Sequence, residues 1–171
     1  LLLDADLTSD QRTHVETIHR SGRTLLRIIN DILDLSKIQA GKISLELLRF
    51  DLHDALKDVL ELFTDQASRK GVMLSHDIPD AIPTVLLGDP NRISQILFNL
   101  LGNAIKFTER GSISLAISIL EEQAHDVVLR FDVQDTGPGI SPDYQKRIFE
   151  SFSQEDASIS RKHGGTGLGL V

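Results

Sequence analysis

The fold of this chain depends most on residues 89–111, which read DPNRISQILFNLLGNAIKFTERG. At about 100° per residue, an α-helix over this stretch has one apolar side and one polar side. The apolar side consists of Ile93, Ile96, Leu97, Leu100, Leu101 and Ala104. The polar side consists of Arg92, Gln95, Asn99, Asn103 and Lys106. Two carboxamides and an ammonium in one line suit a hydrated Mg²⁺ and a polyphosphate, although any surface helix also has a polar side.

The composition limits the classes of function. The chain has 171 residues, a net charge of −7, 40% hydrophobic residues and no cysteine. This length fits one domain or a small domain joined to a helical element, and the negative charge argues against nucleic-acid binding. Without cysteine there is no disulfide framework, which suits the cytoplasm. No apolar run reaches the roughly 18–20 residues of a membrane helix, so we expect no membrane contact by this segment, although the parent protein can be membrane-anchored.

Residues 8–41 are expected to form one long helix, capped by Thr8 or Ser9 and ended by Gly41. Its heptad seam comprises Val15, Ile18, Gly22, Leu25, Ile29 and Ile32, and a wider stripe adds Ile28, Leu33, Leu35 and Ile38. A stripe this wide favours a bundle of about four helices over a two-stranded coiled coil. Since one helix cannot form a bundle alone, we expect a homodimer through residues 8–41. The alternative is a helix that packs on its own domain.

The middle of the chain predicts a second domain. Residues 42–49 are an edge strand or a linker, and residues 51–70 are an amphipathic helix that begins at Asp51 and is ended by Gly71. Its expected inward residues are Leu52, Leu56, Val59, Leu60 and Phe63. A strand over 72–76 and a proline-containing loop up to Gly88 then lead into the helix at 89–106.

Two alternating segments predict an antiparallel hairpin. The first has Ile113, Leu115, Ile117 and Ile119 on one face, and the second has Val127, Leu129, Phe131 and Val133. A loop over 121–126 joins them. Because each strand has one apolar face, the helices at 51–70 and 89–106 are expected to cover them as an α/β two-layer sandwich. The whole chain is therefore α+β, a long helix followed by this sandwich, and lacks the strand–helix alternation of a parallel dinucleotide fold.

Two glycine-rich segments follow. DTGPGI at 135–140 places a carboxylate at a strand end before glycines, which suits purine recognition, although Asp-Thr-Gly is also an ordinary turn. HGGTGLGL at 163–170 can form a nest of backbone N–H groups for phosphate. Neither segment fits a Walker loop, which needs Gly-Lys-Ser/Thr, or a Rossmann fingerprint, because Pro142 and Leu170 occupy its third glycine position.

Four segments in this order resemble the motifs of sensor histidine kinases and their Bergerat-type ATP-binding fold. They are the N box at 99–106, the first glycine box at 135–139, the F box at 148–152 and the second glycine box at 165–169. LDLSKIQAGK at 33–42 also resembles the end of the second dimerisation helix of hybrid kinases. The resemblance implies a dimerisation and phosphotransfer segment at 1–42, without its N-terminal part, and an ATP-binding domain at 43–171, incomplete at the C-terminus.

The resemblance also implies roles for single residues. Asn103, assisted by Asn99, would coordinate Mg²⁺, Lys106 would meet the ATP phosphates, and Asp135 would accept from the adenine amine. The remaining implied contributors to the ATP pocket are Gly137, Gly139, Ile140, Phe149, Phe152, Gly165, Thr166, Gly167, Leu168 and Gly169. Phe149 and Phe152 would anchor a polar lid over 153–164. Within it, Arg161 and Lys162 would either touch the terminal phosphate or remain solvated.

Asn99 helps to distinguish between two reactions of ATP, hydrolysis and phosphoryl transfer. Related ATPases carry a glutamate there to activate water, and a neutral amide is a poor general base, so phosphoryl transfer is favoured over hydrolysis. The family's acceptor histidine precedes an acid, whereas His14 and His19 precede Val15 and Arg20. We therefore expect the acceptor, the only catalytic side chain implied, to lie outside this chain. The parent would phosphorylate its own histidine and then a receiver-domain aspartate. A Bergerat-type ATPase and a non-catalytic dimeric scaffold are the alternatives.

Overall fold

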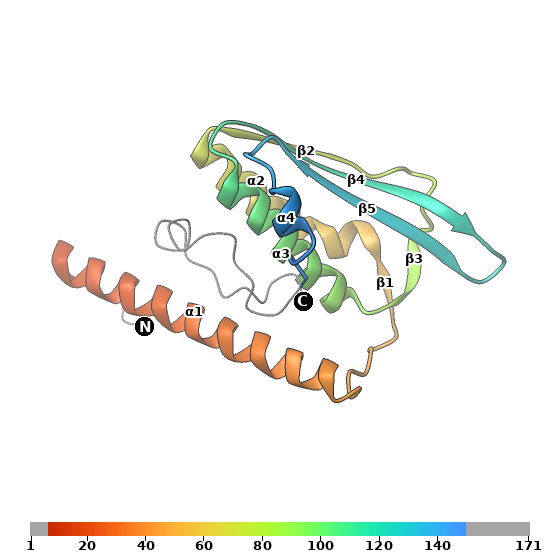
Figure 1. Cartoon of the computed structure of the whole chain (residues 1–171), viewed down its shortest axis with the longest axis horizontal. Helices are drawn as coiled ribbons and strands as arrows, with labels where there is room; N and C mark the ends of the chain where they lie inside the picture. The colour runs from red at the N-terminus through yellow and green to blue at the C-terminus, as the bar shows by residue number, and fades with distance from the viewer. Residues whose placement is uncertain (1–6, 150–171) are drawn as a thin grey trace. The chain divides into compact units, whose positions relative to one another are not determined.

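The computed structural model describes residues 7–149 (Figure 1). They fall into two compact units, one with the first helix and the chain up to Ile43, and one that spans Ser44–Ile148. No helix in the part of the chain that is described is both long and apolar enough to cross a membrane.

The first unit is built on helix α1 (Ser9–Gln39). Its start is a capping box, because Thr8 Oγ1 accepts from Gln11 N–H and Gln11 Oε1 accepts from Thr8 N–H. Gly41, at φ +62°, follows the C-cap Ala40, so the predicted start and end of the helix are confirmed. In the single chain the predicted apolar stripe is largely exposed, at Ile18, Leu25, Ile29, Ile32, Leu33 and Ile38, and Leu26 outside the stripe is exposed as well.

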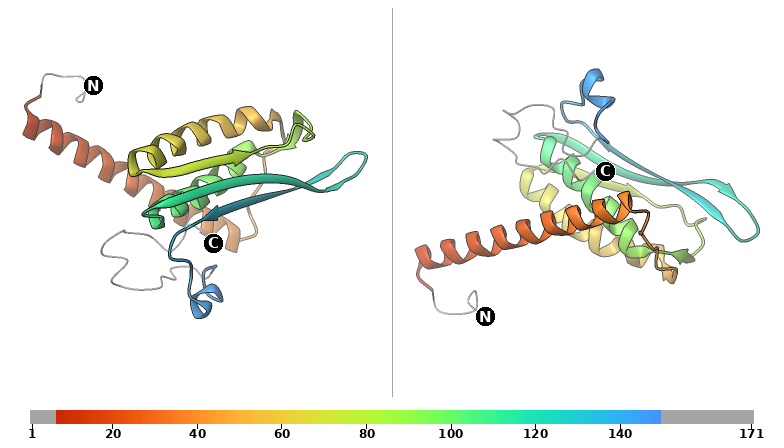
Figure 2. Two further views of the ribbon diagram at one scale, coloured as in Figure 1. Left: turned by 90° about the horizontal axis from the view of Figure 1, so that it is seen from above. Right: turned by 60° about the horizontal axis from the view of Figure 1, so that its bottom comes forward.

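The second unit has two layers (Figures 1 and 2). Helices α2 (Leu52–Lys70) and α3 (Pro90–Phe107) cover one face of a three-stranded sheet. The sheet consists of β2 (Val72–Asp77), β4 (Gly111–Glu122) and β5 (Val127–Asp135), in the order β2-β4-β5. Strand β2 is parallel to β4, and β5 is antiparallel to β4. The predicted two-layer sandwich is therefore confirmed.

The core lies between the helices and the sheet. The predicted inward residues of α2 are all buried, and the sheet contributes Ile113, Leu115 and Ile117. On α3 the prediction is wrong for Ile96, whose side chain is 58% exposed, whereas Ile105 is buried. The apolar side of α3 is centred on Leu97 and Leu101, and Ile96 is turned about 100° away from Leu97. Burial of these side chains is the main force that holds the two layers together.

A second, smaller sheet corrects the prediction for residues 79–88. Instead of a loop up to Gly88, the chain forms strand β3 (Val85–Gly88), which pairs antiparallel with β1 (Leu48–Asp51). Only the end of the predicted edge strand or linker at 42–49 belongs to β1. Strands of four residues show too few alternations for a periodic signal, and a partner far along the chain supplies their hydrogen bonds. The parallel β2–β4 pair, connected through α3, is likewise a long-range feature that the sequence did not reveal.

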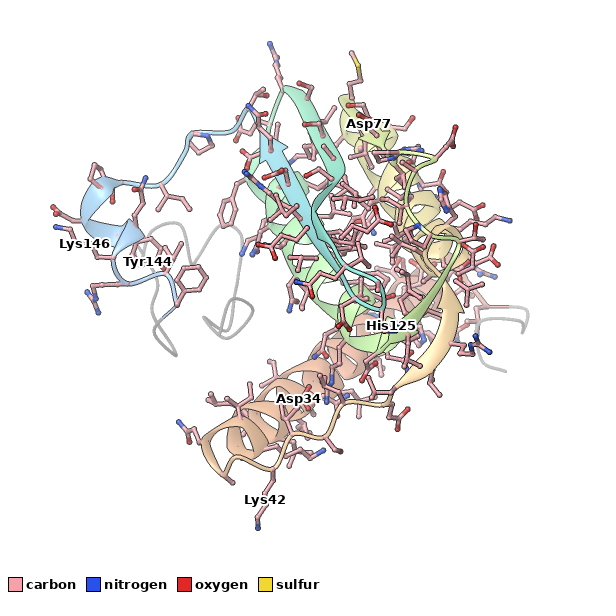
Figure 3. All side chains as sticks on the ribbon, turned by 90° about the vertical axis from the view of Figure 1, so that its right-hand side faces the viewer. Asp34, Lys42, Asp77, His125, Tyr144 and Lys146 are labelled. Atoms are coloured by element: carbon pink, nitrogen blue, oxygen red, sulfur yellow. The ribbon has the colours of Figure 1, made fainter. Side chains whose placement is uncertain are left out.

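The β4–β5 hairpin is longer than predicted, and it extends past the ends of the covering helices (Figures 1 and 2). Gln123 N–H donates to Asp126 O at 2.8 Å and closes the turn. His125 lies in this turn, toward the viewer in Figure 3. The register shifts between Ile119 and Glu121, so Leu120 is the extra residue of a bulge and is 57% exposed.

Candidate functional site

The polar side of α3 carries three predicted site residues, Asn99, Asn103 and Lys106, all partly buried. Among the described residues, the carboxamides of Asn99 and Asn103 have no hydrogen-bond partner. The Lys106 ammonium lies 4.8 Å from the centroid of the Phe107 ring, within cation–π range. Both carboxamides are therefore available to a ligand on this side of the helix.

The start of α3 is fixed by the carboxylate of Asp89. Its Oδ1 accepts from Arg92 N–H at 3.1 Å, and its Oδ2 accepts from Glu46 N–H at 3.1 Å. The hydrogen bond from Glu46, followed by that from Arg92, holds the pKa of Asp89 below its ordinary value because both favour the ionised form. The chain that enters the second unit is thereby tied to the helix that carries the two asparagines.

The loop after β5 is fixed against the beginning of β4. Thr136 N–H donates to Ser112 O at 3.1 Å, and Thr136 Oγ1 accepts from Ser112 N–H at 3.0 Å. Asp135, the last residue of β5, is exposed, and its Oδ1 accepts from Gly137 N–H at 2.8 Å. A carboxylate has about four acceptor positions, so Asp135 retains capacity for a ligand amine.

The structure brings this loop against the C-terminal end of α3. A Cβ built on Gly137 would lie 3.2 Å from Phe107 O and 2.7 Å from Asp135 Oδ1. A side chain at this position would therefore require the Asp135 carboxylate to move and the Phe107 peptide to shift slightly, so glycine favours the close approach. Gly139, at φ +75°, has a left-handed backbone that also favours glycine. Phe107, which directly follows the N box, and Gly137 of the first glycine box, far apart in sequence, are therefore neighbours in space.

The remaining predicted residues are exposed or lie outside the described residues. Ile140 and Phe149 are exposed. Helix α4 (Pro142–Gln145), marked in Figure 3 by Tyr144 and by its C-cap Lys146, lies apart from the sheet. His14 and His19 are exposed on α1. The predicted positions outside the described residues are Phe152, Arg161, Lys162, Gly165, Thr166, Gly167, Leu168, Gly169 and the lid over 153–164.

The donor set fits a magnesium nucleotide better than a metal held by protein carboxylates. No group of three or more His, Cys, Asp and Glu side chains suited to a metal occurs within residues 7–149. Asn99 and Asn103 instead offer amide oxygens beside the ammonium of Lys106. Mg²⁺ commonly takes one or two protein oxygens and completes its shell with water and phosphate.

Both parts of the chain match known protein families. Residues 88–171 match the family described as histidine kinase-, DNA gyrase B- and HSP90-like ATPase. Residues 1–41 match the His Kinase A (phospho-acceptor) domain. The chain belongs to the sensor histidine kinases. The resemblance drawn from the sequence motifs is therefore confirmed.

One similar histidine kinase is the signal transduction histidine-protein kinase BarA of Escherichia coli (strain K12). The two sequences are 47% identical over 171 residues, which cover 100% of this chain and 19% of BarA. The hybrid signal transduction protein dokA of Dictyostelium discoideum is 44% identical over 99% of this chain and 10% of its own length. The crystal structure of full-length ShkA in complex with AMPPNP is 38% identical with a TM-score of 0.75, over 99% of this chain and 34% of that one. The chain thus spans about a fifth or less of these curated relatives.

Sequence reasoning missed two polar contacts at the ends of α3 in this histidine kinase chain. One is the Glu46–Asp89 hydrogen bond, and the other comes from Lys70, whose ammonium donates to the carbonyls of Ile105 and Lys106. Asp before a helix and Lys in a last turn are recognisable signals for caps, but they identify only partners in the same helix. Both missed contacts join segments far apart in the chain.

Proposed function

We propose that this chain is the ATP-binding and dimerisation part of a sensor histidine kinase of the hybrid type. The parent protein transfers the γ-phosphoryl group of ATP to a histidine and then to an aspartate of a response-regulator receiver domain. One observation carries the proposal for the nucleotide site. Asn99 and Asn103, without partners among the described residues, lie on the helix whose end contacts the Asp135–Gly137 loop.

Each residue has a distinct part in the proposed site. The exposed carboxylate of Asp135 accepts from the exocyclic amine of adenine, while Gly137 lets the base approach the backbone. The carboxamide oxygens of Asn103 and Asn99 hold Mg²⁺. The ammonium of Lys106 binds the phosphates. From the sequence alone, we also assign the glycine cluster at 165–169 to the proposed ATP pocket.

The chain's own residues act by binding and positioning rather than by acid–base chemistry. Asn99 occupies the position from which a glutamate would activate water, and a neutral carboxamide cannot accept that proton at neutral pH. Lys106 places a positive charge beside the phosphates. When bound, Mg²⁺ would supply further neutralisation of phosphate charge. Such an arrangement favours transfer to a protein nucleophile over hydrolysis.

The exposed apolar stripe of α1 supports the proposed dimer. A helix with Ile18, Leu25 and Ile29 among its exposed residues needs a partner for this stripe, and a second copy offers the same surface. Two such helices contribute to a bundle of about four. We assign the receiver domain as the second protein partner because the matched phospho-acceptor family and the hybrid relatives support a phosphorelay.

Calorimetric titration with a non-hydrolysable ATP analogue, with and without Mg²⁺, tests the nucleotide site. Asp135→Ala removes the adenine acceptor, and its matched control, Asp77→Ala, removes another exposed carboxylate at the end of a strand. Asn103→Ala removes the main Mg²⁺ ligand, and Asn91→Ala removes a carboxamide from the first turn of the same helix. The controls separate the proposed contacts from general effects of mutation.

The expected result is binding that Mg²⁺ strengthens. Asp135→Ala weakens it about 10- to 100-fold, the equivalent of one hydrogen bond to a charged group, and Asn103→Ala abolishes the gain from Mg²⁺. Both controls bind like the parent chain. If the parent chain does not bind, or if Asp135→Ala and Asn103→Ala bind unchanged, the proposed site is wrong. Steady phosphate release under Mg·ATP would favour the ATPase alternative instead.

A further inference from the structure

Helices α2 and α3 run parallel, which brings their C-terminal ends together. Near their starts, Ser94 Oγ of α3 donates to Ala55 O of α2 at 3.5 Å. Near their ends, Lys70 of α2 reaches the last turn of α3. The carbonyls of a last helical turn point away from the helix and carry partial negative charge. Two such ends side by side concentrate this charge at one edge of the unit.

The ammonium of Lys70 lies at this edge. It donates to the carbonyl oxygen of Ile105 and, at 3.1 Å, to that of Lys106. The N–H groups four residues beyond these carbonyls lie outside α3, which ends at Phe107. The cation therefore satisfies carbonyls of the last turn and offsets the negative ends of the helices.

The peptide groups that Lys70 holds belong to functional positions of the proposed site. One carbonyl belongs to Lys106 itself, whose side chain we assign to the phosphates. The carbonyl oxygen of the next residue, Phe107, lies 3.2 Å from where a Cβ on Gly137 would be, and Gly137 N–H donates to the carboxylate of Asp135. A change in the last turn of α3 would thus move both the phosphate-binding ammonium and the adenine-binding loop.

We propose that Lys70 is a positioning residue of the nucleotide site and acts through the backbone of α3. Its ammonium holds the turn of α3 from which the Lys106 side chain extends. Its positive charge also reduces the electrostatic repulsion between a polyphosphate and the negative C-terminal end of the helix. This inference rests on the proposed nucleotide-binding function. It assigns a role in binding to a residue of α2, outside the four sequence motifs.

The test compares two ligands on three variants. Lys70→Met keeps an unbranched side chain without the charge, Lys70→Arg restores a cation, and Lys57→Met removes an exposed lysine elsewhere on α2. Affinities for a non-hydrolysable ATP analogue with Mg²⁺ and for adenosine are measured by calorimetry. We expect Lys70→Met to weaken the triphosphate about fivefold and adenosine less than twofold. Lys70→Arg recovers most of the loss, and Lys57→Met binds both ligands like the parent chain.

The outcomes separate this inference from the proposed function. Absence of binding by the parent chain contradicts the nucleotide site itself and the role of Lys70 with it. Binding by the parent chain with an unchanged triphosphate affinity in Lys70→Met contradicts only the role of Lys70. An equal loss for both ligands, without recovery in Lys70→Arg, shows a purely structural contribution and also overturns the inference.

Discussion

The carboxylate of Asp89 accepts a hydrogen bond from the backbone N–H of Glu46 at 3.1 Å while its other oxygen caps α3 through Arg92 N–H. One side chain therefore joins the chain that enters the ATP-binding unit to the helix that carries the proposed Mg²⁺ ligands. A single ionisable group at such a junction makes the start of α3 sensitive to acid.

Asp89→Asn is expected to lower the resistance of the second unit to urea at neutral pH. The pKa of Asp89 is lower in the folded protein than in the unfolded chain, so its stabilisation is present above the ordinary carboxyl pKa and is lost as the pH falls through the folded pKa. The difference between wild type and Asp89→Asn should shrink on acidification. Urea unfolding followed by circular dichroism across this range measures it. Asp126→Asn, in the hairpin turn, is the control, and a constant difference at all pH values would contradict the prediction.

Leu101→Ala is expected to destabilise the second unit by about 2–5 kcal/mol, because it removes a fully buried side chain between the helices and the sheet. Ile96→Ala, on the same helix, should cost less than about 1 kcal/mol because Ile96 is 58% exposed. Urea unfolding gives both values. Similar losses for the two variants would mean that Ile96 is buried in solution, for example by a second chain.

Gly111→Ala is expected to destabilise the protein by about 2–4 kcal/mol. Gly111 has φ +112°, and a Cβ there would lie 2.1 Å from Thr136 Oγ1, the acceptor for Ser112 N–H. Gly102→Ala is the matched control, because Gly102 is in α3 and its Cβ would make only an ordinary contact with Phe63 at 3.9 Å. Alanine should stabilise that helix by up to about 1 kcal/mol. The free energies of unfolding should thus change in opposite directions.

Gly137→Ala is expected to weaken binding of the ATP analogue about tenfold with a smaller effect on stability. The new Cβ would lie 2.7 Å from Asp135 Oδ1 and displace the carboxylate that we assign to the adenine amine. Gly139→Ala meets no atom within 4 Å and should cost about 1–2 kcal/mol of backbone strain at φ +75°. Calorimetry and urea unfolding on both variants separate the two effects. Unchanged affinity in Gly137→Ala would show that Asp135 does not bind the adenine amine.

Thr108→Val is expected to stabilise the protein by about 1 kcal/mol. Thr108 is fully buried, and among the described residues its Oγ1 has no hydrogen-bond partner, so the hydroxyl loses its hydration on folding without compensation. Thr108→Ser keeps the hydroxyl and loses the buried methyl group, so it should destabilise. A loss of stability in Thr108→Val would indicate an ordered water on this hydroxyl.

The covering helices and the hairpin could be predicted because their signals are local. Helix α2 shows its period in Leu52, Leu56 and Phe63, and its ends in Asp51 and Gly71, all of which the structure confirms. The site motifs were recognisable for a similar reason, since each box is a short run of residues. Strand β3 and the parallel β2–β4 pair were missed because their partners are distant in sequence.

The sequence by itself determined the amphipathic helices, the alternating strands, the glycine-rich boxes and the family, because periodicity and motif spacing are properties of neighbouring residues. Only the tertiary structure decided that the end of α3 lies against Gly137, that Asp89 reaches Glu46, and that Lys70 binds the carbonyls of Ile105 and Lys106. The contacts of Lys70 depend on the parallel packing of α2 and α3 over one sheet, and the contact between Asp89 and Glu46 depends on the pairing of β1 with β3. The apolar core fixes that packing, and no local pattern encodes which polar groups it brings together.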